Sequence, residues 1–204
     1  CTQLKYASLS KNLTVLGDHA FKSTALTNII IPDSLTSLGN SVFANCSSLK
    51  NISFGNGLKS IGNYAFGSCK ALTDITISDS VTLIGEEAFS LCTSLTNVVI
   101  SENIASIGRN SFNNCVSLKS VYLRSPKKPA SMGLNIYAFT YCPEDMVIYY
   151  PSEAEEYWDD PWQGFHTAPW NPAPAAPTIT VSFVTRNPET GEISFTLTFT
   201  GTLQ

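Results

Sequence analysis

A repeat of 23 residues constrains the fold of this chain more than any other feature of its sequence. Between residues 49 and 117 it occurs three times without a gap, as LKNISFGNGLKSIGNYAFGSCKA, LTDITISDSVTLIGEEAFSLCTS and LTNVVISENIASIGRNSFNNCVS. A fixed period of roughly 20 to 50 residues is typical of solenoids, in which each unit buries its apolar side chains against neighbouring units. The sequence therefore predicts a stacked solenoid.

The repeat extends in both directions from this regular middle. Residues 26–48 form another full copy, and residues 4–25 form a copy that lacks the cysteine and is one residue short. A sixth copy begins at Leu118 and regains Phe139 and Cys142 after an insertion that contains Pro126 and Pro129. We therefore expect six coils over residues 1–142.

The coil of residues 72–94 illustrates the expected structure. Its L-x-x-I-x-I spacing is that of a short strand with alternate side chains inward, and Val81 and Ile84 provide a second apolar edge. EEAFSLC, residues 86–92, is expected to form a short helical turn that buries Phe89 and Cys92. The aromatic residue at this position recurs in every coil, and the rings should stack: Phe21, Phe43, Phe66, Phe89, Phe112 and Phe139.

A glycine also recurs at one position, immediately after the second apolar edge. The recurrence suggests a backbone conformation with φ > 0, in which a Cβ atom would be strained. The column comprises Gly17, Gly39, Gly62, Gly85 and Gly108.

All six cysteines follow the repeat, because Cys1 lies three residues before Leu4 just as Cys46 lies three residues before Leu49. This regularity argues against a disulfide framework. Cys46, Cys69, Cys92 and Cys115 are 23 residues apart, and Cys142 follows after 27. A cysteine at one position of successive coils is expected to pack as a small buried apolar residue. Two alternatives remain, a disulfide between neighbouring coils and a lipid on Cys1.

These residues resemble the BspA-like, or treponemal-type, leucine-rich repeat. The motif L-x-x-I-x-I-P-x-S-[LV]-T-x-[IL]-G-x-x-[AV]-F-x-x-C is almost complete in LTNIIIPDSLTSLGNSVFANC, residues 26–46. The resemblance implies a leucine-rich-repeat solenoid. It also implies a bacterial or protist protein, secreted or on the cell surface, that adheres to host proteins or other cells.

Composition excludes several classes of function. The 204 residues are 43% apolar and 14% charged, with a net charge of −4, so no basic surplus favours nucleic acid or anionic lipid. The sequence has no run of about 18 apolar residues, so no membrane span is predicted. The chain begins inside a repeat without Met or a signal peptide, and we interpret it as a processed or cloned piece.

The sequence contains no recognisable catalytic constellation. His19 and His166 lack a Ser, Cys or metal ligand at a catalytic spacing, and cysteines in core positions are poor nucleophiles. No Gly-Lys-Ser/Thr loop or D-x-D-x-D-G calcium loop is present. We expect no enzyme activity, no cofactor and no metal.

Binding is the better hypothesis, because the alternation of the first strand places other residues outward on a sheet that lines the concave face of such solenoids. Their short polar side chains suit a protein or glycan ligand. The alternative is that small residues merely pack well there. The three apolar members are expected to be exposed without a core role: Ile30, Val99 and Tyr122. The remaining candidates are Asn28, Asn51, Ser53, Asp74, Thr76, Asn97 and Arg124.

The repeat ends near residue 142, and three further segments follow. Residues 143–170 are expected to form a cap with a last strand, a proline turn and a short helix. An alternative function for the cap is an aromatic platform formed by Tyr157, Trp158, Trp162 and Trp170. NPAPAAP, residues 171–177, is typical of an extended linker.

Residues 178–204 alternate as a β-hairpin or as a fragment of an Ig-like domain. Ile179, Val181 and Phe183 are predicted on one face, opposite residues 193, 195, 197 and 199. Open strand edges make this segment a candidate for strand addition.

Three hypotheses for function follow from the sequence. The first is a non-catalytic extracellular recognition or adhesion module that binds a protein or glycan of a host or neighbouring cell. The second is a structural spacer within a larger surface protein. The third is an ancillary domain of a secreted hydrolase.

Overall fold

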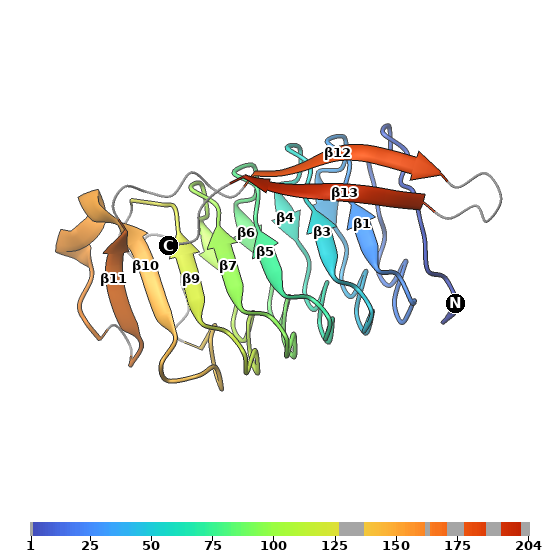
Figure 1. Cartoon of the computed structure of the whole chain (residues 1–204). Coiled ribbons are helices and arrows are strands. Elements are labelled where there is room, and N and C mark those ends of the chain that lie inside the picture. Colours follow the sequence, from blue (N-terminus) through green and yellow to red (C-terminus); the bar gives the residue numbers. More distant parts are fainter. Residues whose placement is uncertain (1, 127–136, 162–163, 171–177, 187–192, 201–204) are drawn as a thin grey trace. The chain divides into compact units, whose positions relative to one another are not determined.

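The computed structural model describes residues 2–126, 137–161, 164–170, 178–186 and 193–200. The chain divides into two compact units, Cys1–Trp170 and Asn171–Gln204. The first is a parallel β-solenoid whose coils follow one another along the chain (Figure 1). Four parts of the chain for which the sequence made predictions lie outside the described residues: Cys1, Trp162, the linker 171–177 and the hairpin turn.

The first strands of the coils form two parallel sheets, one of β1 and β3 and one in the order β5, β7, β9, β10 and β11, and β3 does not pair with β5. Equivalent repeat positions are in register, as in Asn28↔Asn51 and Asp74↔Asn97. From β1 to β10 every second side chain points into the core, which confirms the predicted alternation, whereas β11 does not follow it. The strands are β1 (Asn28–Ile30), β3 (Asn51–Ser53), β5 (Asp74–Thr76), β7 (Asn97–Ile100), β9 (Ser120–Leu123), β10 (Val147–Pro151) and β11 (His166–Trp170).

A second parallel sheet forms the other apolar edge of the coils. Its two-residue strands are β2 (Ser37–Leu38), β4 (Ser60–Ile61), β6 (Leu83–Ile84) and β8 (Ser106–Ile107). The second residue of each strand is buried and the first points away from the core. The prediction of a second inward edge is therefore confirmed.

The predicted helical turn is wrong, because this part of the coil is a row of tight turns. Cys46 N–H donates to Phe43 O within the coil at 3.1 Å, whereas Phe43 N–H donates to Ala65 O of the next coil at 2.7 Å. Alternate N–H groups thus bond to the neighbouring coil, which a helix would not allow. In each of the first five coils two positions have a left-handed backbone, for example Glu87 at φ 54° and Leu91 at φ 62°.

The glycine column is required for a different reason from the one predicted. None of its members has a positive φ. A Cβ atom on Gly85 would instead lie 2.8 Å from the backbone of Gly62 in the preceding coil. A Cβ on Gly62 would lie 2.5 Å from Gly39 O. Glycine is present because neighbouring coils approach closely here.

The core contains the predicted aromatic and cysteine columns. Phe66 and Phe89 stack with centroids 5.2 Å apart and an interplanar angle of 4°, and the column continues from Phe21 to Phe139. Cys46, Cys69, Cys92, Cys115 and Cys142 are free thiols, as predicted, and all but Cys142 are fully buried. Each thiol also donates to a phenylalanine carbonyl of the preceding coil, at 3.1 to 3.3 Å.

The cap has the predicted strand, proline and short helix, and an additional strand. β10 ends at Pro151, and a 3-10 helix, η2 (Ser152–Tyr157), follows and buries only Ala154. β11 then pairs in parallel with β10. Trp158 stacks on Tyr150 with centroids 5.3 Å apart. Trp158 is 8% exposed and belongs to the core cluster.

The second unit is an antiparallel hairpin of β12 (Thr178–Arg186) and β13 (Ile193–Thr200). The predicted pairing is present for Ile179↔Phe199 and Val181↔Leu197. A register shift between Val181 and Phe183 then pairs Phe183 with Thr196 and Val184 with Phe195.

Candidate functional site

The outward residues of the first strands form a surface that we call the exposed sheet face, and they fall into three columns. The first column is Asn28, Asn51, Asp74, Asn97 and Ser120, the second is Ile30, Ser53, Thr76, Val99 and Tyr122, and the third is Pro32, Gly55, Ser78, Ser101 and Arg124. The first column is an amide ladder, in which side chains of neighbouring coils bond to each other. Asn51 Nδ2 donates to Asn28 Oδ1 at 2.6 Å, and Asn97 Nδ2 donates to Asp74 Oδ1 at 2.7 Å. Each amide donates toward the preceding coil, because the parallel register places equivalent side chains side by side.

The ladder is interrupted between Asn51 and Asp74. A carboxylate has no hydrogen to donate, and the structure has no hydrogen bond between these two side chains in its described part. Asp74 is exposed and accepts only from the coil that follows, through Asn97 Nδ2 and Thr96 Oγ1. The interruption coincides with the break between the two sheets, because β3 and β5 are not paired with each other.

The second column has mixed chemistry along the stack. Ile30 is 44% exposed, whereas Ser53 and Thr76 are half-buried. Val99, predicted to be exposed, is only 5% exposed. Val99 points outward as predicted, but it is paired in register with Thr76 on one side and with Tyr122 on the other. An outward apolar residue between a branched and an aromatic neighbour retains little accessible surface.

Tyr122 belongs to an aromatic cluster at the end of this column. Its ring stacks on Tyr149 with centroids 4.8 Å apart and lies 5.2 Å from the ring of Trp170. Burial raises the pKa of the Tyr122 phenol, while a hydrogen bond with Ser120 lowers it and the charge of Tyr149 raises it. The rings largely cover each other, so they offer little aromatic surface to a ligand at this end of the face.

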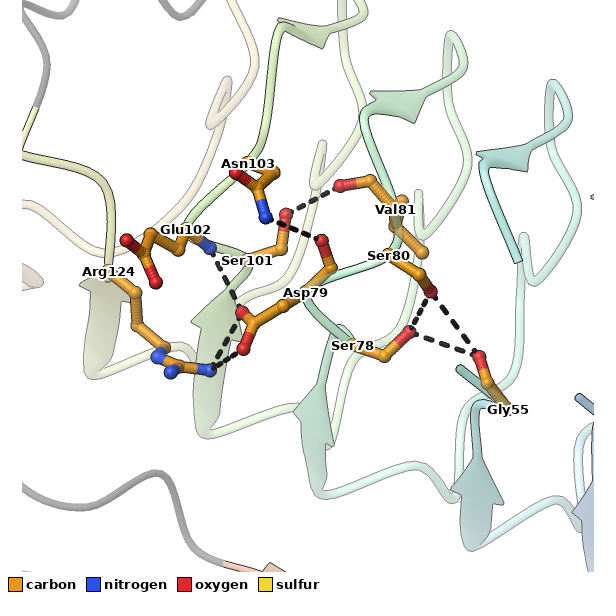
Figure 2. A network of polar contacts seen from close by, with 9 residues as sticks. All are labelled: Gly55, Ser78, Asp79, Ser80, Val81, Ser101, Glu102, Asn103 and Arg124. Atoms are coloured by element: carbon orange, nitrogen blue, oxygen red, sulfur yellow. Dashed lines mark hydrogen bonds and ion pairs between the residues drawn. The ribbon is translucent and has the colours of Figure 1, made fainter. Parts of the chain in front are cut away.

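In the third column, Arg124 forms an ion pair within the chain and is therefore not available to bind a ligand. Arg124 Nη1 donates to both carboxylate oxygens of Asp79 at 2.8 Å, across the coil that lies between them (Figure 2). Asp79 also accepts from the backbone N–H of Glu102 at 3.1 Å. The guanidinium is thus held by its own chain, and its Nη1 edge is occupied.

Two other residues of this column, Ser78 and Ser101, and the nearby Asn103 also form hydrogen bonds within the chain. Ser101 is buried and its hydroxyl donates to Val81 O at 2.6 Å, and Asn103 Nδ2 donates to Asp79 O at 3.0 Å (Figure 2). The Ser78 hydroxyl lies 3.3 Å from Gly55 O, which accepts its hydrogen bond. These contacts join successive coils and leave few polar groups of the third column for a ligand.

The alternative platform in the cap is not assembled as expected. Trp158 is in the core, and Trp170 lies at the opposite, outward side of the sheet with Tyr122. Tyr157 is half-buried and packs against the core cluster. The pKa of its phenol is raised by a hydrogen bond with Glu156 and by the charge of that carboxylate. The structure therefore does not bring Tyr157, Trp158 and Trp170 into one surface.

Reactive groups are not concentrated anywhere in the described part of the first unit. Burial raises the pKa of the Cys69, Cys92 and Cys115 thiols, and it raises that of Cys142 to about 12. Thiols that stay protonated are weak nucleophiles. His166 Nδ1 lies 3.5 Å from Asp160 in an exposed pair. No group of three metal-ligating side chains is found among the described residues.

Sequence reasoning missed Asp79 and Tyr149 as members of this surface. Asp79 lies in the turn after β5, and its carboxylate accepts two hydrogen bonds from Arg124 of the face. Tyr149 occupies the column position of Tyr122 in the cap, as the register Tyr149↔Tyr122 shows. Its signal was the alternation of β10, which continues the repeat beyond the last recognisable motif.

Comparisons with known proteins agree with this geometry. A family model of the BspA type leucine rich repeat region matches in six copies, over residues 1–45 and 14–146. The T. pallidum leucine-rich repeat protein is 27% identical over 67% of this chain and 62% of its own, with a TM-score of 0.55. No curated protein matches the chain.

A second solved structure is the leucine rich cell surface protein of Faecalibacterium prausnitzii A2-165. It is 30% identical over 76% of this chain and 44% of its own, with a TM-score of 0.52. The chain thus spans less than two thirds of either protein. Within the described residues, no helix has the length and apolar character needed to cross a membrane. This chain belongs to the BspA-type leucine-rich repeat family.

Proposed function

We propose that the chain is a non-catalytic recognition module of a secreted or surface-displayed protein, and that it binds a host or neighbouring-cell protein or glycan on the exposed sheet face. The observation that carries the proposal is the contrast between inward and outward positions of the same strands. Inward residues such as Ile52 and Ile75 are uniform and buried, whereas outward residues such as Ser53 and Thr76 differ from coil to coil. Uniform positions maintain the stack, and the varied positions are free to determine a ligand.

The names of similar proteins support the location. One solved relative is called a cell surface protein, and the family model describes a leucine rich repeat region of the BspA type. The raised pKa values of the cysteine thiols also argue for a role other than nucleophilic catalysis.

The test is to block the face without changing the core. Ser53→Arg with Thr76→Arg places two long charged side chains in the middle of the second column. The matched control, Ser37→Arg with Leu83→Arg, places the same groups on the outward positions of the second sheet. Binding to arrays of extracellular matrix proteins and glycans should be lost in the first variant alone, with thermal melting preserved in both. Equal binding by both variants would contradict the proposal.

A structural spacer is the second candidate function. It is favoured by the mutual bonding of polar groups on the face, above all the amide ladder and the Arg124–Asp79 pair. A spacer needs no ligand, so arrays that detect no binding by the wild-type chain would support it. Deleting one internal coil, residues 72–94, would then alter only the distance between flanking domains.

A further inference from the structure

We infer that the solenoid has a hinge between its third coil (residues 49–71) and its fourth coil (residues 72–94), and that Phe54 creates it. The two coils separate and close again on the side of the exposed sheet face, while their other sides stay joined. The inference goes beyond the proposed function, because a hinge serves a spacer as well as a binding module. Its basis is a break in backbone hydrogen bonding on one side of this join.

The backbone ladder of the first strands is missing between β3 and β5, although these strands lie next to each other. At the equivalent position of other coils, the N–H group donates to the preceding coil. Lys50 N donates to Thr27 O at 2.8 Å, and Thr96 N donates to Thr73 O at 2.7 Å. Thr73 N itself has no backbone partner among the described residues.

The hydrogen bond that closes the other end of the strand is missing as well. Ile31 N donates forward to Ser53 O at 2.8 Å, and Ile77 N donates to Val99 O at 2.9 Å. Phe54 occupies the same repeat position, and its N–H finds no backbone partner in the described part of the chain. The break therefore extends along the whole strand.

The same two coils are bonded to each other on their other sides. In the sheet of two-residue strands, β4 pairs with β6. In the turns, Phe66 N donates to Ala88 O at 2.8 Å, and Ser68 N donates to Ser90 O at 2.7 Å. A join that is bonded along two sides and open along the third can bend about the bonded sides, which is the geometry of a hinge.

The size of Phe54 explains why the ladder breaks at this join. Its ring is 9% exposed and meets the Phe66 ring edge-on, with centroids 5.8 Å apart and an interplanar angle of 89°. The second, fourth, fifth and sixth coils have a smaller aliphatic residue here, at most 1% exposed: Ile31, Ile77, Ile100 and Leu123. A side chain too large for its core position shifts the backbone that carries it, so β3 does not pair with β5.

Serine hydroxyls span the break in place of the backbone ladder (Figure 2). Ser78 and Ser80 of the fourth coil lie with their hydroxyls 3.3 and 3.5 Å from Gly55 O of the third coil. These contacts are long for hydrogen bonds donated by a hydroxyl. They hold the closed state weakly, and rotation of the side chains lets them release and form again.

NMR of the full chain measures the break and the motion separately. Thr73 and Thr96 both follow leucine, so the intrinsic exchange rates of their amides are matched. The Thr73 amide should exchange about tenfold faster, as expected for the loss of one hydrogen bond. Relaxation dispersion should detect motion on the μs–ms timescale at residues 50–55 and 73–78 and none at residues 96–101. Equal exchange of the two amides would overturn the inference, and so would fast exchange at Thr73 with flat dispersion, which indicates a static break.

Phe54→Ile tests the cause of the break. The variant gives the third coil the residue that the second and fourth coils have, so β3 should pair with β5. The Thr73 amide should then exchange as slowly as that of Thr96, and the dispersion should disappear. An unchanged Thr73 amide in this variant would overturn the inference.

Ser78→Ala combined with Ser80→Ala tests the contacts that close the hinge. Their loss should raise the population of the open state about two- to tenfold, the effect of one net hydrogen bond. Ser101→Ala is the matched control, because its hydroxyl donates to Val81 O at 2.6 Å across the next join, where β5 and β7 are paired. It should leave the open population unchanged. An equal effect of the control, or no effect of the double variant, would overturn the inference.

Discussion

Replacing Gly85 with alanine tests how closely the coils are packed. The added Cβ would lie 2.5 Å from Asn63 Oδ1 and 2.8 Å from both Asn63 N and Gly62 C. Cβ atoms in proteins do not approach other heavy atoms this closely, and two of these three atoms are backbone. The Asn63 side chain cannot simply turn away, because its Oδ1 accepts the Glu86 N–H at 2.9 Å.

The expected cost is that of overpacking, about 1–3 kcal/mol of unfolding free energy. For a unit of this size, each kcal/mol lowers Tm by about 2–4 °C. Gly85→Ala should therefore melt about 2–12 °C below wild type in a circular dichroism scan.

Gly17→Ala is the matched control at the same repeat position. No heavy atom lies within 4 Å of a Cβ placed on Gly17, which has no preceding coil in this chain. The change should alter the unfolding free energy by no more than about 0.5 kcal/mol. If both variants lost the same stability, the cause would be a shared backbone conformation, and the close approach of coils would be refuted.

Three further predictions concern the turns, the aromatic column and the thiols. Leu91→Asn should raise the unfolding free energy by about 1 kcal/mol in urea titrations, because Leu91 has φ 62° and asparagine tolerates a left-handed backbone. Asn114→Leu at the equivalent position should lower the unfolding free energy by a similar amount. No change in either variant would contradict this prediction. Phe89→Ala should cost about 3–5 kcal/mol, because its ring is fully buried between two others; Phe21→Ala, with one ring partner and a half-buried side chain, should cost clearly less. The unfolding free energy should fall as pH rises above 9, the ordinary pKa of the thiol, because the unfolded chain then releases protons that the buried thiols retain. Cys92→Ala should make the fall in unfolding free energy less steep by about 1.4 kcal/mol per pH unit. An unchanged pH dependence would argue against burial of that thiol.

The inward half of this structure was predictable because it recurs. Leucine, isoleucine, phenylalanine and cysteine return at fixed positions, and a residue that recurs in a stack must contact its own equivalents. The period thus determined the coil, the register of β5 with β7, and the burial of Cys69 and Phe66.

Two predictions about the turns were wrong for a physical reason. A recurring glycine shows only that a Cβ is not tolerated, and both a positive φ and a close neighbour give that result. Conversely, the positions that do have positive φ are occupied by residues as different as Tyr64, Glu87 and Leu91. Their left-handed conformation is imposed by hydrogen bonds between coils, so the residue type at these positions does not predict it.

The outward half was predictable in direction but not in accessibility. Val99 and Arg124 occupy the outward positions assigned to them, yet one is buried between its neighbours and the other binds Asp79, 45 residues earlier. Such outcomes depend on the size and reach of side chains in adjacent coils. Periodicity places those side chains on the face without fixing their conformations.

Photo-crosslinking from the exposed sheet face tests the central claim of this account most directly. A photoreactive phenylalanine analogue replaces Thr76 in one variant and Ser37, on the second sheet, in the other. Each is irradiated with the matrix proteins or glycoproteins that the wild-type chain binds on arrays. The account predicts adducts from position 76 and none from position 37. Adducts from position 37 alone, or equally from both positions, would show that the exposed sheet face is not where the ligand binds.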